Sequence, residues 1–127
     1  MVHLDYRDTR PIYIQIMDGF REQIATGVLG PGEKLPSVRE LAVTLAINPN
    51  TIQRAYKLLE FDGWIATIPG KGCFVSRNQK ALQQEIDRWY ASLDEAAANL
   101  LALGIPAEEI IEHLKKHQKP EEGRKRL

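Results

Sequence analysis

The chain has 127 residues, enough for one or two small domains with a modest hydrophobic core. Its composition, 43% hydrophobic and 27% charged, is typical of soluble globular proteins, and no apolar run approaches the roughly 20 residues that span a membrane. The 17 basic and 17 acidic residues balance, so net charge alone does not indicate the partner, and the single cysteine, Cys73, excludes an intrachain disulfide and favours a cytoplasmic location.

The first predicted helix begins near Pro11, because proline is favoured at the first helical position. Gly27 is the predicted end, since glycine adopts the backbone conformation that stops a helix. Between them an apolar stripe recurs at every fourth position, at Ile12, Ile16, Phe20 and Ile24. This spacing predicts one amphipathic helix.

A helix, a tight turn and another helix are predicted next. Ser37 is a good N-cap for the first of them, and Glu40 three residues later completes a capping box. Asn48 followed by Pro49 marks both the turn and the next start, because asparagine caps and proline occupies the first position. The following helix is predicted over 49–62.

Two short strands follow, over 64–68 and 73–75, and the connection between them contains Gly70, Lys71 and Gly72. The Gly-Lys-Gly segment lacks the spacing of a phosphate-binding loop, so we interpret it as a tight hairpin turn. Helix, turn, helix and hairpin in this order indicate a winged helix-turn-helix, which presents one helix to the DNA major groove.

After Arg77 a 3.5-residue repeat is held over three heptads, which is typical of a helix with a narrow packing seam. Gly104 ends this helix and Pro106 begins a last one. The predicted fold is mostly α with a small β-hairpin wing: a winged helix-turn-helix over 1–77, two helices over 78–118 and a polar tail over 119–127. The repeat consists of Leu82, Ile86, Trp89, Leu93, Ala96, Leu100 and Leu103.

The helix after Asn48 is the candidate for DNA recognition. Gln53 can pair with adenine, and Arg54 can pair with guanine or bind phosphate. Asn50 and Thr51 can bind phosphates at the helix N-terminus. Two simpler interpretations stay open: Asn48 and Thr51 also serve as caps, and Gln53 and Arg54 also fit a solvated helix face.

Two further cations flank this helix in the predicted fold. Arg39, early in the preceding helix, would face the DNA backbone or form a surface ion pair with Glu40 or another carboxylate. Lys71, at the hairpin tip, would contact the minor groove or a phosphate, or simply protect an exposed hairpin edge.

The remaining polar residues give weaker signals. Glu109, His113 and His117 are spaced by four on one helix face, which can ligate a metal, but three ligands on one helix favour a solvated face. Cys73 alternates with apolar residues and is interpreted as a small buried hydrophobe. No nucleophile–base pair and no cofactor motif is found, so we predict no enzyme, no metal and no cofactor.

Several ordered motifs resemble the winged helix-turn-helix of GntR-type bacterial transcriptional regulators. They are LPSVRELA, NPNTIQRAYKLLEFDGWI and PGKGCFV, with the lead-in RPIYIQIMDGFREQIATGVLGPGEKLPS. Most members of the family add a large effector-binding domain. The short helical remainder of this chain is similar to that of the YtrA subfamily, whose C-terminal region mediates dimerisation.

The resemblance implies a homodimer that binds a pseudo-palindromic operator, usually as a repressor and often near transporter genes. The implied DNA contacts are Arg39, Asn48, Asn50, Thr51, Gln53, Arg54, Gly70 and Lys71. The seam would then form the dimer interface through Leu82, Ile86, Trp89, Leu93, Leu100 and Leu103. Pro49 and Gln53 stand where some relatives carry arginines, so the family's operator sequence does not transfer, and any small-molecule effector is unknown. The alternative is a winged-helix protein-interaction module without DNA specificity, favoured only by the neutral net charge.

Overall fold

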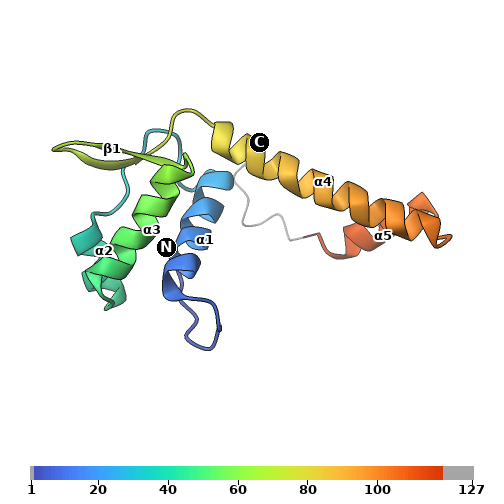
Figure 1. Cartoon of the computed structure of the whole chain (residues 1–127), viewed down its shortest axis with the longest axis horizontal. Helices are drawn as coiled ribbons and strands as arrows, with labels where there is room; N and C mark the ends of the chain where they lie inside the picture. Colours follow the sequence, from blue (N-terminus) through green and yellow to red (C-terminus); the bar gives the residue numbers. More distant parts are fainter. Residues whose placement is uncertain (1, 119–127) are drawn as a thin grey trace. The chain divides into compact units, whose positions relative to one another are not determined.

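The computed structural model describes residues 2–118, which form five helices and one two-stranded hairpin (Figure 1). In chain order these are α1 (Ile12–Ala25), α2 (Val38–Leu45), α3 (Pro49–Phe61), β1 (Ile65–Ile68), β2 (Gly72–Val75), α4 (Lys80–Ala102) and α5 (Ala107–Lys116). The predicted fold class, mostly helical with a small hairpin, is confirmed. The predicted polar tail, 119–127, lies outside the described residues.

The chain divides into two units, one that ends at Leu82 and one that begins at Gln83. We call the described part of the first unit, residues 2–82, the head; it holds α1, α2, α3, the hairpin and the first residues of α4. We call residues 83–118 the C-terminal region; it holds the rest of α4 and all of α5.

The core of the head forms where α1 and α3 lie side by side (Figure 1). The two helices meet through the apolar stripes that their spacing predicts, and burial of each large side chain contributes about 1.5–3 kcal/mol. The buried residues of this contact are Ile16, Phe20 and Ile24 from α1 and Ile52, Ala55 and Leu59 from α3. Because one side of α3 is committed to this core, the opposite side points outward.

Tyr56 links α3 to two neighbouring segments. Its ring packs edge-on against Phe20, with 5.7 Å between the ring centroids, and its hydroxyl donates a hydrogen bond to the Pro36 carbonyl at 2.7 Å. Burial raises the pKa of Tyr56 well above its ordinary value. The hydroxyl therefore stays protonated and keeps this bond at physiological pH.

The predicted capping box begins α2. The Glu40 amide donates to Ser37 Oγ at 3.0 Å, and the Ser37 amide donates to Glu40 Oε1 at 2.9 Å. These hydrogen bonds from Ser37, helped by the charge of Lys34, lower the pKa of Glu40. The carboxylate therefore stays ionised near neutral pH and stabilises the start of α2.

The turn between α2 and α3 is short and tightly bonded. Ala46 adopts a left-handed conformation, with φ of 56°, and ends α2. The Asn50 amide then donates to Asn48 Oδ1 at 2.8 Å, and Pro49 occupies the first turn of α3. The predicted cap is confirmed.

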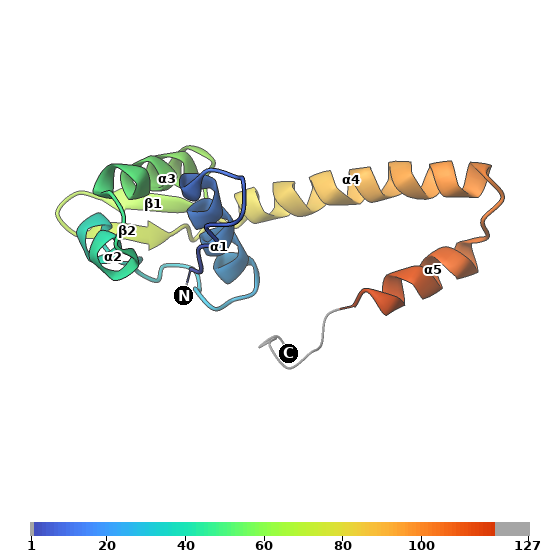
Figure 2. The ribbon, with the colours of Figure 1, turned by 90° about the horizontal axis from the view of Figure 1, so that it is seen from below.

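The two strands pair antiparallel in a single register, from Ile65 opposite Val75 to Ile68 opposite Gly72. Figure 2 shows this hairpin lying beside α3 within the head. Ile65 and Val75 are buried and attach the base of the hairpin to the core.

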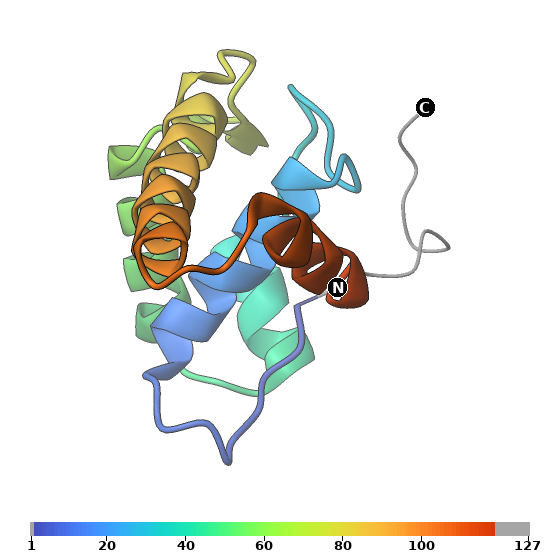
Figure 3. The same cartoon turned by 90° about the vertical axis from the view of Figure 1, so that its right-hand side faces the viewer.

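The C-terminal region contains no buried residue in either helix. The chain reverses at Gly104, whose φ is 90°, so that α5 turns back from the end of α4 (Figures 2 and 3). The predicted heptad helix is present but ends at Ala102, one residue before Leu103. Large exposed apolar side chains of the two helices are Ile86, Trp89, Tyr90, Leu93, Leu100, Leu101, Ile111 and Leu114. None of the helices among residues 2–118 is long and apolar enough to cross a membrane.

The capping box yields the first test. Ser37→Ala removes one of its two hydrogen bonds and is expected to lower the free energy of unfolding by about 1 kcal/mol. Urea unfolding at a fixed protein concentration measures this. Thr44→Ala, an exposed change in the same helix, is the control and should stay within about 0.5 kcal/mol of the original chain. Equal stabilities of the Ser37 variant and the original chain would contradict the assigned role.

Candidate nucleic-acid interface

The outward side of α3 is polar. Asn50, Gln53, Arg54 and Lys57 are all exposed there, whereas the intervening Ile52 is buried. Residues three and four apart share a helix face, so these side chains form one surface. Lys57 was not among the predicted contacts, although its three-residue spacing from Arg54 places it on the same helix face.

The first turn of α3 combines two roles for the same residues. Asn48 Oδ1 is occupied by the Asn50 amide, and the Thr51 amide bonds the Asn48 carbonyl at 3.0 Å. The capping interpretation of Asn48 is thus confirmed. The side chains of Asn48 and Asn50 are exposed at the N-terminus of α3, and each carries an amide donor group.

Arg39 lies at the start of α2 with an exposed side chain. The alternative ion pair with Glu40 or another carboxylate is not formed within residues 2–118. The guanidinium of Arg39 therefore remains available to an external anion.

Arg54 contacts a side chain that no sequence pattern pairs with it. Its guanidinium carbon lies 3.9 Å from the centre of the Tyr13 ring, and its Nη2 donates to the Tyr13 hydroxyl at 3.2 Å. Tyr13 belongs to α1, so the α1–α3 packing brings the two together.

The hairpin tip presents Lys71 between two glycines with positive φ, Gly70 at 77° and Gly72 at 120°. The Lys71 amide bonds the Ile68 carbonyl at 2.9 Å, which closes the predicted tight turn. Gly72 also allows a close approach: a β-carbon there would lie 2.9 Å from Cε of Lys34. Lys34 thus adds a second exposed cation beside the turn, one missing from the predicted set.

Lys34 reaches the hairpin through a backbone bridge to Phe74. In the same segment the Leu35 amide donates to the Cys73 carbonyl at 2.8 Å, which covers the outer edge of β2. Sequence patterns cannot reveal this contact, because residues 32–35 show no strand alternation.

Glu60 of α3 covers the other edge of the hairpin. The Thr67 amide and hydroxyl donate to its carboxylate at 3.3 and 3.0 Å. Cys73, predicted to be buried, is only half-buried, and its Sγ lies 3.4 Å from Thr67 Oγ1. Each edge of the hairpin therefore forms hydrogen bonds with another segment of the chain, and on the β1 side that segment is α3.

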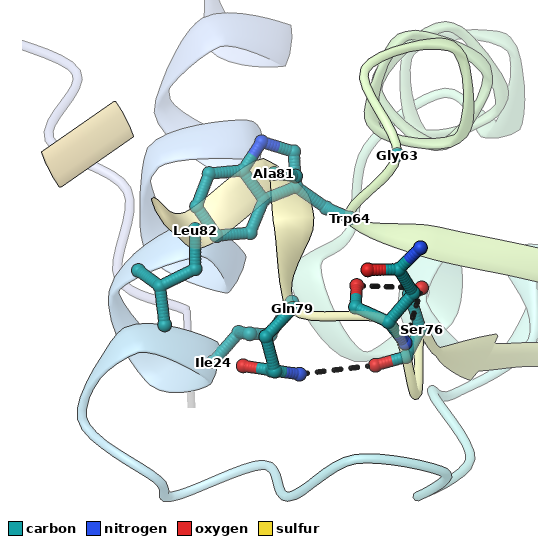
Figure 4. Close-up of a pocket in the computed structure, with 8 residues that line it drawn as sticks. Ile24, Gly63, Trp64, Ser76, Gln79, Ala81 and Leu82 are labelled. Atoms are coloured by element: carbon teal, nitrogen blue, oxygen red, sulfur yellow. Dashed lines mark hydrogen bonds between the residues drawn. The ribbon is translucent and has the colours of Figure 1, made fainter. Parts of the chain in front are cut away.

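A small hollow in the head is lined by the segment that joins β2 to α4 and by the first turn of α4, together with residues at the end of α1 and just after α3 (Figure 4). Ile24, Trp64 and Leu82 supply its apolar wall, and Gln79 donates to the Ser76 carbonyl at 3.1 Å on its polar side. Its volume of about 10 Å³ holds no more than a single water molecule, so it offers no room for a metabolite. Leu82, the first residue of the predicted seam, is half-buried here against the core of the head.

Two of the three possible metal ligands, Glu109 and His113, lie on α5, and the third, His117, directly follows it. The rings of His113 and His117 are 4.6 Å apart. Across residues 2–118 no group of three histidine, cysteine, aspartate or glutamate side chains is placed to share an ion.

The comparison that decides the family covers α1 through β2. The family model of bacterial regulatory proteins of the gntR family matches residues 12–75. The chain belongs to the GntR family. The resemblance inferred from the motifs is therefore confirmed.

Two proteins illustrate how this GntR-family chain relates to known members. It is 48% identical over 80 residues to the transcriptional repressor YtrA of Bacillus subtilis, and the match covers 63% of this chain and 62% of YtrA. A GntR family transcriptional regulator from Listeria monocytogenes has 39% identity and a TM-score of 0.70, over 89% of this chain and 98% of that structure.

A third, the AraR DNA-binding domain in complex with operator ORR3, has 27% identity and a TM-score of 0.52, over 58% of this chain and 89% of that one. The chain is thus a GntR-type transcriptional regulator with a DNA-binding helix-turn-helix, and its relatives are regulators rather than enzymes.

The hydrogen bonds of Glu60 generate a test of how the wing is held. Glu60→Ala removes the acceptor of the Thr67 amide and is expected to speed hydrogen exchange at that amide several-fold, because the edge of β1 opens to water. Exchange followed by NMR measures it. Asp62→Ala, one residue beyond α3, is the control and should leave the Thr67 amide unchanged. Unchanged Thr67 exchange in the Glu60 variant would refute the contact.

Proposed function

We propose that this GntR-family regulator binds a pseudo-palindromic DNA operator as a homodimer and represses transcription. The observation that carries the proposal is the exposed polar face of α3, flanked by unpaired cations from α2 and from the wing. Arg39, Lys57 and Lys71 form no ion pair within residues 2–118, so their charges are available to phosphates.

The proposed contacts separate into two classes. Gln53 and Arg54 project from α3 and have the donor patterns that read base edges in the major groove. The other residues are proposed to bind the DNA backbone or, where a side chain is lacking, to let it come close. They are Arg39, Asn48, Asn50, Thr51, Gly70 and Lys71 from the predicted set, with Lys34 and Lys57 added by the structure. Phosphate contacts fix the register of the helix, and base contacts supply the specificity.

The neutral net charge is compatible with this proposal because the charges are segregated. The C-terminal region is rich in carboxylates, which include Glu85, Asp87, Asp94, Glu95, Glu108, Glu109 and Glu112. The total charge therefore underestimates the positive character of the proposed DNA-facing side of the head.

The C-terminal region supports the homodimer. Trp89 is 61% exposed and Leu101 is 51% exposed in a single chain, and neighbouring apolar side chains continue along α4 and α5. Contiguous exposed apolar surface of this kind favours association. A second copy is the proposed occupant, because a two-fold pair of heads matches a pseudo-palindromic site and places two recognition helices about 34 Å apart.

The comparisons support the direction of regulation and the DNA partner. The YtrA relative is a repressor, and the AraR domain is bound to its operator. Selection of DNA duplexes from a random-sequence library tests the proposal. Enrichment of a two-fold related sequence whose binding weakens steeply with salt is expected. Recovery of no preferred sequence would contradict it and favour a protein-interaction module instead.

Lys71 provides a test of the wing contact. Lys71→Ala is expected to weaken binding to the selected duplex and to reduce the slope of log affinity against log salt by about 1 per head, because one phosphate contact is lost. Fluorescence anisotropy across salt concentrations measures both quantities. Lys115→Ala, an exposed lysine of α5, is the matched control and should leave the slope unchanged. Equal effects of the two substitutions would exclude Lys71 from the interface.

Leu93 provides a test of the proposed dimer. Leu93→Glu places a carboxylate in the seam and is expected to convert the protein to a monomer and weaken operator binding at least tenfold, since only paired heads bind both half-sites. Light scattering and anisotropy measure the two effects. Ala91→Glu adds the same charge two residues away, on the opposite side of the heptad, and should remain dimeric. A monomeric original chain at micromolar concentration would refute the dimer.

A further inference from the structure

We propose that Tyr13 of α1 is a positioning residue for DNA recognition: it holds the Arg54 guanidinium in the direction in which it meets the operator. This inference rests on the proposed function and deepens it. Tyr13 lies on α1, and its side chain makes a specific contact with Arg54 on the outward face of α3.

The contact uses two different parts of the tyrosine. The guanidinium carbon of Arg54 lies 3.9 Å from the ring centre, and Nη2 donates to the hydroxyl at 3.2 Å. The ring restrains the plane of the guanidinium, and the hydroxyl restrains its rotation within that plane. The guanidinium has two parallel donor pairs, Nε with Nη2 and Nη1 with Nη2, and Nη2 carries two hydrogens. The tyrosine hydroxyl is the one hydrogen-bond partner of this guanidinium among residues 2–118 and takes a single hydrogen of Nη2, so one donor pair can still donate two hydrogen bonds to guanine or phosphate.

Tyr13 is itself firmly placed. Its neighbour Gln15 is buried, accepts from the Asp5 amide at 2.8 Å and donates to the Arg10 carbonyl at 3.2 Å. Ile16, one turn along, has no exposed surface. The first turn of α1 is therefore held both by the core and by the segment before it, and the Tyr13 side chain is itself partly buried against the core.

The chemistry of this support is what suits it to DNA binding. Four other arginines among residues 2–118 lie beside carboxylates: Arg7 beside Asp5, Arg10 beside Asp8 and Asp18, Arg21 beside Asp18, and Arg88 beside Glu85. A carboxylate partner cancels the charge and repels a phosphate. A neutral phenol restrains the guanidinium and leaves its full positive charge for DNA.

Restraint of Arg54 before binding reduces the conformational entropy that DNA binding must remove. Loss of the restraint should therefore weaken operator binding without changing the number of charges at the interface. This separates a positioning role from a phosphate contact, because the salt dependence stays the same while the affinity falls.

The test is a double-mutant cycle on the duplex selected with the original chain. Tyr13→Leu is expected to weaken binding about fivefold with an unchanged salt slope, and Tyr13→Phe, which keeps the ring, about twofold. Arg54→Ala should weaken binding more. The double variant Tyr13→Leu with Arg54→Ala should bind no worse than Arg54→Ala alone, because the tyrosine acts only through the arginine.

Lys57→Ala supplies the matched control, since Lys57 is an exposed cation of the same helix without a partner among the described residues. The fold-loss of affinity from Lys57→Ala should multiply with the fold-loss from Tyr13→Leu, because the two residues act independently. The inference would be overturned if the Tyr13 variants bound the duplex as tightly as the original chain does. It would also be overturned if the fold-losses of affinity from Tyr13→Leu and Arg54→Ala multiplied in the double variant. If the Tyr13→Leu variant folds poorly, the test rests on the affinity of Tyr13→Phe, which keeps the ring and loses only the hydroxyl. The proposed function fails separately, if the original chain selects no duplex.

Discussion

The packing of α3 against α1 determines what the head presents to its surroundings. Ile52, Ala55 and Leu59 have no exposed surface, so α3 cannot rotate about its axis without opening the core. This constraint directs Gln53, Arg54 and Lys57 outward. The same contact brings Tyr13 beneath Arg54, and Glu60 at the other end of α3 holds the edge of the wing. The orientation of the outward face of α3 therefore follows from an apolar contact.

Charged side chains of the head form ion pairs near the start of α1, and none is found among the described residues on the proposed DNA-facing side. Near the start of α1, hydrogen bonds from Arg10 lower the pKa of Asp8, which shows how a paired arginine is neutralised locally. On the proposed DNA-facing side, Arg39, Lys57 and Lys71 have no such partners among residues 2–118, and Arg54 has only a neutral one. A chain with no net charge thus keeps a surface suited to a polyanion.

The local features of the fold follow from the sequence because they depend on neighbouring residues. The box of Ser37 and Glu40, the cap at Asn48 and the hairpin turn each involve residues within a few positions of one another. The apolar spacing of α1 and α3 likewise predicts their buried faces. The heptad helix was predicted for the same reason, and only its end differs, since the chain leaves the helix before Leu103.

The missed features are contacts between residues far apart in the chain. Arg54 and Tyr13 are separated by 41 positions, and no sequence pattern in either helix predicts their contact. The approach of Lys34 to Gly72 depends on a bridge between segments that have no common periodicity. Leu82 fits the heptad repeat perfectly in spacing, yet it is half-buried against the core of the head. Such contacts arise only when tertiary packing places whole elements side by side.

The central claim is that two copies of the chain present two such surfaces to one duplex. Hydroxyl-radical footprinting of the original chain on its selected duplex tests this most directly. Two protected patches are expected on the same face of the DNA, related by two-fold symmetry. Their centres should lie one helical turn, about 10 base pairs, apart, or a multiple of that distance. A single protected patch at saturating protein, or uniform protection along the duplex, would contradict it.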